Sequence, residues 1–102
     1  MLNPAAFTDL QNYIKKRIGT AEYRVSGVWR SCPIVESVVM ADGTVRIKCQ
    51  IAPGGACTIT GARLKNMDGQ AWATTTVNVN IETSSEHVLV WFDFVLSEKE
   101  VS

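Results

Sequence analysis

Two Asp-Gly pairs, Asp42-Gly43 and Asp68-Gly69, constrain this chain more than any other feature of its sequence. Each pair stands between two runs rich in β-branched residues. An Asp-Gly pair favours a two-residue type I′ turn, because both central residues of that turn need positive φ. We therefore predict two β-hairpins, at about residues 34–51 and 58–81, and expect the rest of the chain to pack on them.

The register of the first hairpin follows if its loop has two residues, which places Ala41 opposite Thr44. One face then collects Ile34, Val38, Met40, Val45, Ile47, Cys49 and Ile51. The other face carries Ser37, Val39, Thr44, Arg46, Lys48 and Gln50, as a solvated surface would. Glu36 falls on the apolar face, where a lone carboxylate is costly. It is either a functional acid or, as we favour, is turned outward at the sheet margin or by a bulge after Pro33.

The second hairpin is predicted in the same way. A two-residue loop pairs Met67 with Gln70, Leu64 with Ala73, Ala62 with Thr75 and Thr60 with Val77. Gly61 suggests a bulge that re-phases the strand, because Ile59 otherwise points away from Leu64. The return strand alternates clearly, with one face made of Ala71, Ala73, Thr75, Val77, Val79 and Ile81 and the other of Trp72, Thr74, Thr76, Asn78 and Asn80.

An amphipathic helix is predicted before the hairpins, over about residues 4–18. Its apolar stripe, spaced by three and four residues, is Phe7, Leu10, Ile14 and Ile18. Asn3 fits the N-cap, the basic run at 15–17 complements the helix dipole, and Gly19 fits a left-handed stop. We expect the stripe to cover one face of the sheet.

Three further segments complete the expected fold. Residues 21–30 are predicted to form two short strands, or one bent strand, around Ser26-Gly27, with a new strand beginning at Pro33. Residues 52–57 are predicted to be a loop. The final strand, about 87–96, is apolar on both faces in its middle, so we expect it to be central, with Leu89 and Trp91 under the helix or a subunit contact. The prediction is an α+β fold of about six strands, with the N-terminal helix packed on an antiparallel β-sheet or small β-sandwich.

Composition bounds the class of protein. With 102 residues the chain is the size of one domain, so we take 1–102 as a single domain. Ten basic residues balance ten acidic ones, so the surplus needed for nucleic-acid binding is absent, and self-association is not opposed by net charge. No run approaches the length of a membrane span and the start does not resemble a signal peptide, so we expect a cytoplasmic or virion-associated protein.

Candidate chemistry is sparse. Cys32, Cys49 and Cys57 lack the spacing of a zinc site or disulfide framework and are expected to be reduced and mostly buried. The lone histidine, His87, is expected to be a solvated imidazole at a strand end. We therefore predict no enzyme, no metal site and no cofactor. Outward tryptophans favour interfaces, so the candidate interface residues are Trp29, Trp72 and Trp91, unless the helix covers one of them.

The second half of the chain carries a family resemblance. The form I-T-x-x-x-L-x-x-x-D-G occurs at Ile59, Thr60, Leu64, Asp68 and Gly69. A strand rich in Thr and Val and a final strand ending in Glu98 and Glu100 follow it. Over residues 45–100, and more loosely in the N-terminal helix, the chain resembles small proteins from the tail and fibre regions of tailed bacteriophages and prophages. The region Trp29–Pro33 lies outside this pattern.

The resemblance implies a non-enzymatic virion component or tail-assembly accessory. It would act through contacts with other tail or fibre proteins or with itself as a homo-oligomer. The alternative is a binding module that encloses a lipid or other hydrophobic ligand between helix and sheet. Small residues such as Ala62 and Ala73 facing large ones favour that alternative.

Overall fold

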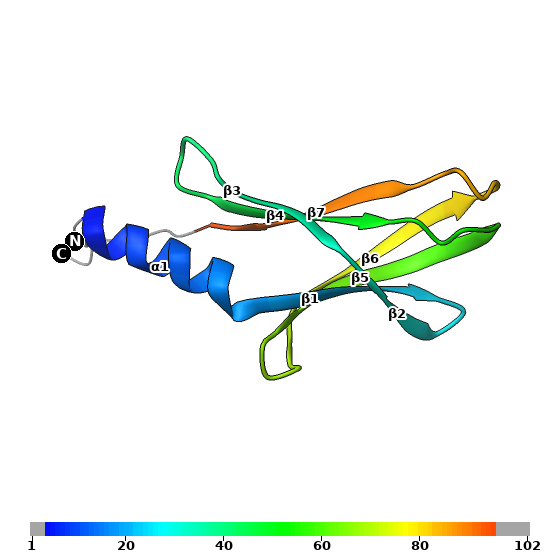
Figure 1. The fold of residues 1–102 in the computed structure, drawn as a ribbon, viewed down its shortest axis with the longest axis horizontal. Helices are drawn as coiled ribbons and strands as arrows, with labels where there is room; N and C mark the ends of the chain where they lie inside the picture. The colour runs from blue at the N-terminus through cyan, green and yellow to red at the C-terminus, as the bar shows by residue number, and fades with distance from the viewer. Residues whose placement is uncertain (1–3, 96–102) are drawn as a thin grey trace.

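The computed structural model describes residues 4–95 as one helix followed by seven strands (Figure 1). The elements are α1 (Pro4–Arg17), β1 (Ile18–Val25), β2 (Val28–Cys32), β3 (Ile34–Val39), β4 (Val45–Ile51), β5 (Cys57–Asn66), β6 (Ala71–Ile81) and β7 (Val88–Phe94). The strands form two antiparallel sheets, ordered β2-β1-β5-β6 and β3-β4-β7. The predicted α+β fold class is confirmed, in its sandwich form.

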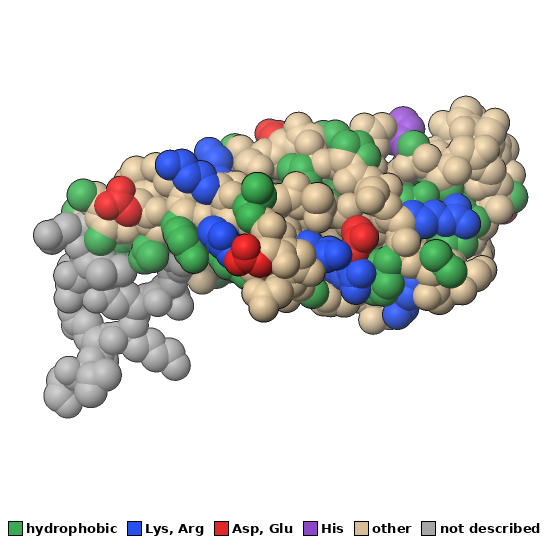
Figure 2. Space-filling view, turned by 60° about the horizontal axis from the view of Figure 1, so that its bottom comes forward, with side chains coloured by type: hydrophobic (Ala, Val, Ile, Leu, Met, Phe, Trp, Pro, Cys, Tyr) green, Lys and Arg blue, Asp and Glu red, His purple; other side chains and the backbone are tan. Residues whose placement is uncertain are grey.

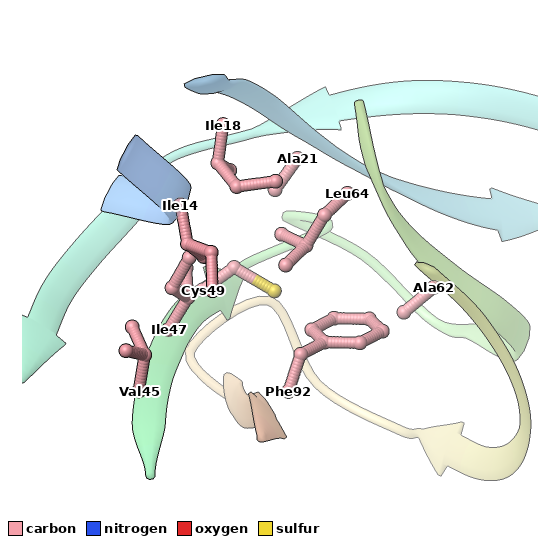
Figure 3. Packing of buried hydrophobic residues seen from close by; sticks show 9 residues of the cluster. All are labelled: Ile14, Ile18, Ala21, Val45, Ile47, Cys49, Ala62, Leu64 and Phe92. Atoms are coloured by element: carbon pink, nitrogen blue, oxygen red, sulfur yellow. The ribbon is translucent and has the colours of Figure 1, made fainter. Parts of the chain in front are cut away.

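The core lies between the two sheets (Figure 3). From β4 come four side chains with no exposed surface, Val45, Ile47, Cys49 and Ile51. Facing them from the other sheet are Ala21, Ile59, Ala62 and Leu64, all equally buried. Removing such an aliphatic side chain from water contributes about 1.5–3 kcal/mol, so this layer stabilises the sandwich. The predicted inner face of β4 is confirmed.

Both Asp-Gly reversals have three-residue loops, not the two-residue loops predicted. In the first, Met40 N donates to Thr44 O at 2.7 Å and Gly43 N donates to Met40 O at 2.9 Å. The second repeats this pattern, with Asn66 N to Gln70 O at 2.8 Å and Gly69 N to Asn66 O at 3.0 Å. Only the glycine of each pair has positive φ, 91° and 81°, as in a type I turn followed by a bulge.

The longer loop shifts the register of the β3–β4 hairpin by one residue. Val39 pairs with Val45, Ser37 with Ile47 and Val38 with Arg46, so the predicted faces are wrong for Ser37, Val38 and Val39. Met40, predicted to face the core, lies in the loop. Thr44, predicted to be solvated, is 7% exposed. The three-residue loop has a local cause. The Asp42 carboxylate accepts a hydrogen bond from Thr44 N at 3.0 Å and so stabilises the wider turn. The same hydrogen bond lowers the pKa of Asp42.

Glu36 is turned outward, as we favoured. A register shift between Ile34 and Glu36 places it opposite Lys48, and the two side chains form an ion pair at 3.0 Å. Its side chain is 50% exposed. The bulge after Pro33 therefore removes the expected conflict of a carboxylate on the apolar face.

The β5–β6 register agrees with the prediction at Leu64–Ala73 and Ala62–Thr75. An irregularity next to Lys65 compensates for the extra loop residue, although the predicted Met67–Gln70 pair is replaced by Asn66 with Gln70. A second shift between Ile59 and Gly61 confirms the predicted bulge. It replaces the expected Thr60–Val77 pair and buries Ile59 on the same side as Leu64. The predicted alternation of β6 is confirmed from Ala73 to Ile81.

The first two strands form the expected pair around Ser26-Gly27. Both turn residues have positive φ, 52° and 76°, as a two-residue hairpin loop requires. Pro33 then separates β2 from β3 and carries the chain from one sheet to the other. The predicted loop at 52–57 ends one residue early, because β5 begins at Cys57.

Helix α1 continues directly into β1 and projects from one end of the sandwich (Figure 1). Ile14, the one buried residue of α1, packs in the core cluster with Val45 and Ile47, so the predicted packing of the helix on the sheet is confirmed. Leu10 of the predicted stripe is 40% exposed, and Ile18 belongs to β1. Gly19 is a strand residue and not a helix stop. A Cβ there would lie 2.7 Å from Met67 Sδ, so glycine permits the close approach. The predicted cap Asn3 lies outside the described residues.

Strand β7 lies at the edge of its sheet, not at the centre as predicted. Its inner face carries Phe92, which is 8% exposed, while Leu89 and Trp91 point outward and are 50% and 53% exposed. The helix does not cover them, because its buried residue Ile14 packs with Val45 and Ile47 on the opposite, inner face of this sheet. The predicted last residue, Leu96, and the acidic ending at Glu98 and Glu100 lie outside the described residues.

Candidate protein-interaction surface

The structure does not bring the three candidate interface tryptophans together. Trp29 lies on the outer face of the β2-β1-β5-β6 sheet, whereas Trp91 lies on the outer face of the β3-β4-β7 sheet. Trp72 lies at the start of β6, with its ring 6.2 Å from Tyr13 of the helix and 6.4 Å from Phe94 of β7. The helix therefore contacts one of the three tryptophans, Trp72.

Trp29 is occupied by contacts within the chain. The guanidinium groups of Arg24 and Arg63 lie 5.4 Å and 4.0 Å from its ring centroid, at cation–π distance. Arg63 is also paired with Glu22 at 2.7 Å. In Figure 2, which brings this layer forward, basic and acidic side chains alternate along the surface and hydrophobic ones are scattered among them. This face is a charged network, and Trp29 is part of it.

Gly61 makes room for this network, which gives a testable prediction. A Cβ at Gly61 would lie 3.3 Å from Trp29 Cη2 and 3.4 Å from the Arg24 guanidinium. Gly61→Val should therefore displace both groups and lower the free energy of unfolding by about 1–3 kcal/mol, measured by denaturant titration. Gly55→Val is the matched control, because a Cβ there has no neighbour within 4 Å. Equal losses in the two variants would contradict the close packing at Gly61.

The outer face of β7 combines an apolar centre with a fixed charged border. Arg46 donates to both oxygens of Asp93, at 2.7 Å and 2.9 Å, and its guanidinium lies 5.2 Å from the centroid of the Trp91 ring. The hydrogen bonds from Arg46 lower the pKa of Asp93, so the pair persists to a lower pH than an isolated aspartate would allow. Trp91 lies beside this pair, and Leu89 lies two residues farther along the same face. Exposed apolar anchors with a polar border are the pattern of a protein interface.

Within the described part of the chain, the other candidate groups do not form a second site of this kind. His87 is exposed, as expected, and residues 4–95 contain no cluster of three His, Cys, Asp or Glu side chains suited to a metal ion. All three cysteines are free thiols. Cys49 is buried, and Cys32 and Cys57 are half-buried. A hydrogen bond to Cys49, together with burial, raises the pKa of the Cys32 thiol.

A pocket of about 540 Å³ lies at the end of the sandwich away from the helix. The turn at Ser26, Arg30 and the glycine loop at 53–55 line it. None of the candidate interface residues is part of it. The predicted lipid site between helix and sheet stays a prediction, and within residues 4–95 no helix has the length and apolar character to cross a bilayer.

Sequence reasoning named Trp91 but missed the groups that define its surroundings. The sequence predicts that Leu89 shares the Trp91 face and lies under the helix or a subunit contact. The helix does not cover this face, and the subunit contact stays a prediction. The Arg46–Asp93 pair was missed because the two residues are 47 positions apart and meet only through the β4–β7 register. The apolar character of both β7 faces was the available signal. Comparisons of this chain with protein-family models, curated proteins and solved structures found no match.

Proposed function

We propose that this protein is a non-enzymatic structural or assembly protein of a phage or prophage tail that acts through protein contacts made by β7. The assignment of β7 as the contact surface rests on one observation. Leu89 and Trp91 are half exposed and lie side by side on an edge strand. Large apolar side chains in such a position lose water on association, and tryptophan is enriched among residues that dominate interface energies.

The tail assignment rests on the resemblance of residues 45–100, and the surface is consistent with what that resemblance implies. A structural protein needs a rigid scaffold that presents a contact face. Here seven ladder pairs hold β7 on β4 without a register shift, and Arg46 fixes Asp93 and lies against Trp91. The face is therefore preorganised, which reduces the entropy lost on binding.

A deletion experiment in the phage or prophage that encodes the chain tests the proposal. Deletion should lower the number of complete tails seen by negative-stain electron microscopy and the number of infectious particles. The wild-type gene should restore both. Leu89→Ser/Trp91→Ser should fail to restore them, because it removes the apolar anchors without touching the core.

Val28→Ser is the matched control for this experiment. Val28 is 57% exposed, like the two β7 residues, but lies on β2 at the far edge of the other sheet. It should restore tails as well as the wild type does. Unchanged tails and infectivity in the deletion strain would overturn the tail assignment.

A further inference from the structure

The four sheet edges of this sandwich differ in how they are protected. The β2 edge has only five residues, includes Arg30 and is followed by Pro33. The β3 edge begins after the same proline and has a register shift next to the charged Glu36. Short edges, charges, prolines and bulges are the devices by which proteins prevent edge strands from pairing with other chains. One side of the molecule is therefore protected.

The other side of the sandwich ends in β6 and β7. Two register shifts distort β6, one near Ile59 and one near Lys65 of its partner strand β5. In contrast, β7 pairs with β4 without interruption from Val88 to Phe94, and its only charged residue, Asp93, is neutralised by Arg46. A regular, apolar, uncharged edge is the kind that accepts another strand, because its outward backbone groups need hydrogen-bond partners.

The side chains of β7 favour β7 of a second copy of the chain as the strand that pairs with this edge. When two antiparallel copies continue one sheet about a twofold axis perpendicular to it, residues on the same face lie opposite each other. An axis at Val90 places Leu89 opposite Trp91 of the second copy, and Trp91 opposite its Leu89. It also places Asp93 opposite His87 of the second copy, an acceptor facing a donor. An axis at Trp91 instead sets the Asp93 carboxylate against Leu89.

We infer that β7 pairs antiparallel with β7 of a second copy about a twofold axis at Val90, joining two three-stranded sheets into one six-stranded sheet. The four anchor side chains then form one apolar cluster on the outer face, bordered at each end by a pair of His87 and Asp93. Because the formal net charge is zero, repulsion between two copies of the chain is weak. The dimer deepens the proposed function, on which it rests, by naming a second copy as the partner.

Sedimentation equilibrium of the full chain tests the dimer. The wild type should give a mass twice that of the chain. Leu89→Ser and Trp91→Ser should each raise the dissociation constant by about 30-fold or more, whereas Val28→Ser should leave it unchanged. Circular dichroism of each variant verifies the fold, which these exposed positions should not disturb. A wild type that is monomeric at all concentrations overturns the inference.

Disulfide trapping tests the register. A tagged His87→Cys chain mixed with an Asp93→Cys chain, and oxidised with glutathione disulfide, should give a cross-linked heterodimer. Either variant alone should give about tenfold less. Efficient cross-linking of Trp91→Cys alone would place the axis at Trp91 and overturn the register. A dimer in solution with unaffected tails in the deletion strain contradicts the tail assignment alone, whereas a monomer with defective tails contradicts the dimer alone.

Discussion

Ile47→Ala is expected to lower the free energy of unfolding by about 2–5 kcal/mol. Ile47 has no exposed surface and lies in the middle of β4, in the cluster that includes Leu64 and Ala62 from the opposite sheet. Truncation removes apolar contacts and leaves a cavity between two sheets whose backbones are held by ladder hydrogen bonds and cannot close it fully. Urea or guanidinium unfolding, followed by circular dichroism, measures the loss.

Val39→Ala is the control for this prediction. Val39 is also β-branched and belongs to β3, the neighbour of β4, but it is 39% exposed. Its truncation should cost under about 1 kcal/mol, as surface changes usually do. If Ile47→Ala cost no more than Val39→Ala, the two sheets would not face each other as described.

Asn66→Ala is expected to cost about 1–3 kcal/mol. Asn66 is 5% exposed, and its side-chain oxygen accepts from Asp68 N at 3.0 Å and from Gln70 N at 2.9 Å. Its amide also donates to the Gln70 side chain at 3.2 Å. Alanine leaves two backbone donors of the reversal without this acceptor. Denaturant titration gives the change in stability.

Asn78→Ala serves as the comparison, because Asn78 is an exposed asparagine on β6. Its loss should be much smaller than that of Asn66→Ala. Equal, small losses in the two variants would mean that the Asn66 side chain does not hold the turn, and our explanation of its loop length would fail.

The sequence predicted those features that depend on neighbouring residues. The alternation of β4 identified Val45, Ile47, Cys49 and Ile51 as inward, and all four have no exposed surface. The glycine at position 61 correctly indicated a bulge. Period-two patterns survive small register errors within a strand, since a strand that buries one face keeps its own inside and outside.

Features that depend on a side chain bonding back to the turn were not predicted. Asp-Gly specifies a tight reversal but does not fix the loop at two or three residues. Here the Asp42 and Asn66 side chains accept backbone hydrogens and stabilise the longer loop. One additional loop residue moved Val38 to the outer face, whereas an irregularity opposite Lys65 restored the predicted pairs in the second hairpin.

The order of the strands in the two sheets could not be predicted from the sequence either. The two apolar faces of β7 predicted a central strand, which is the usual reason for such a pattern. The structure places β7 at an edge and leaves Leu89 and Trp91 uncovered. The difference is informative. An edge strand with the composition of a central strand is suited to pairing with a further strand at its free edge. The candidate surface was thus indicated by its residues and located only by the topology.

Hydrogen exchange of the β7 amides at several protein concentrations tests this account most directly. Where β7 pairs with a second copy, the amides of Val88–Phe94 that point away from β4 should exchange more slowly as concentration rises through the dissociation constant, while those at the β2 and β3 edges should not change. Exchange at β7 that is fast and independent of concentration, or protection that appears at the β2 or β3 edge instead, would contradict it.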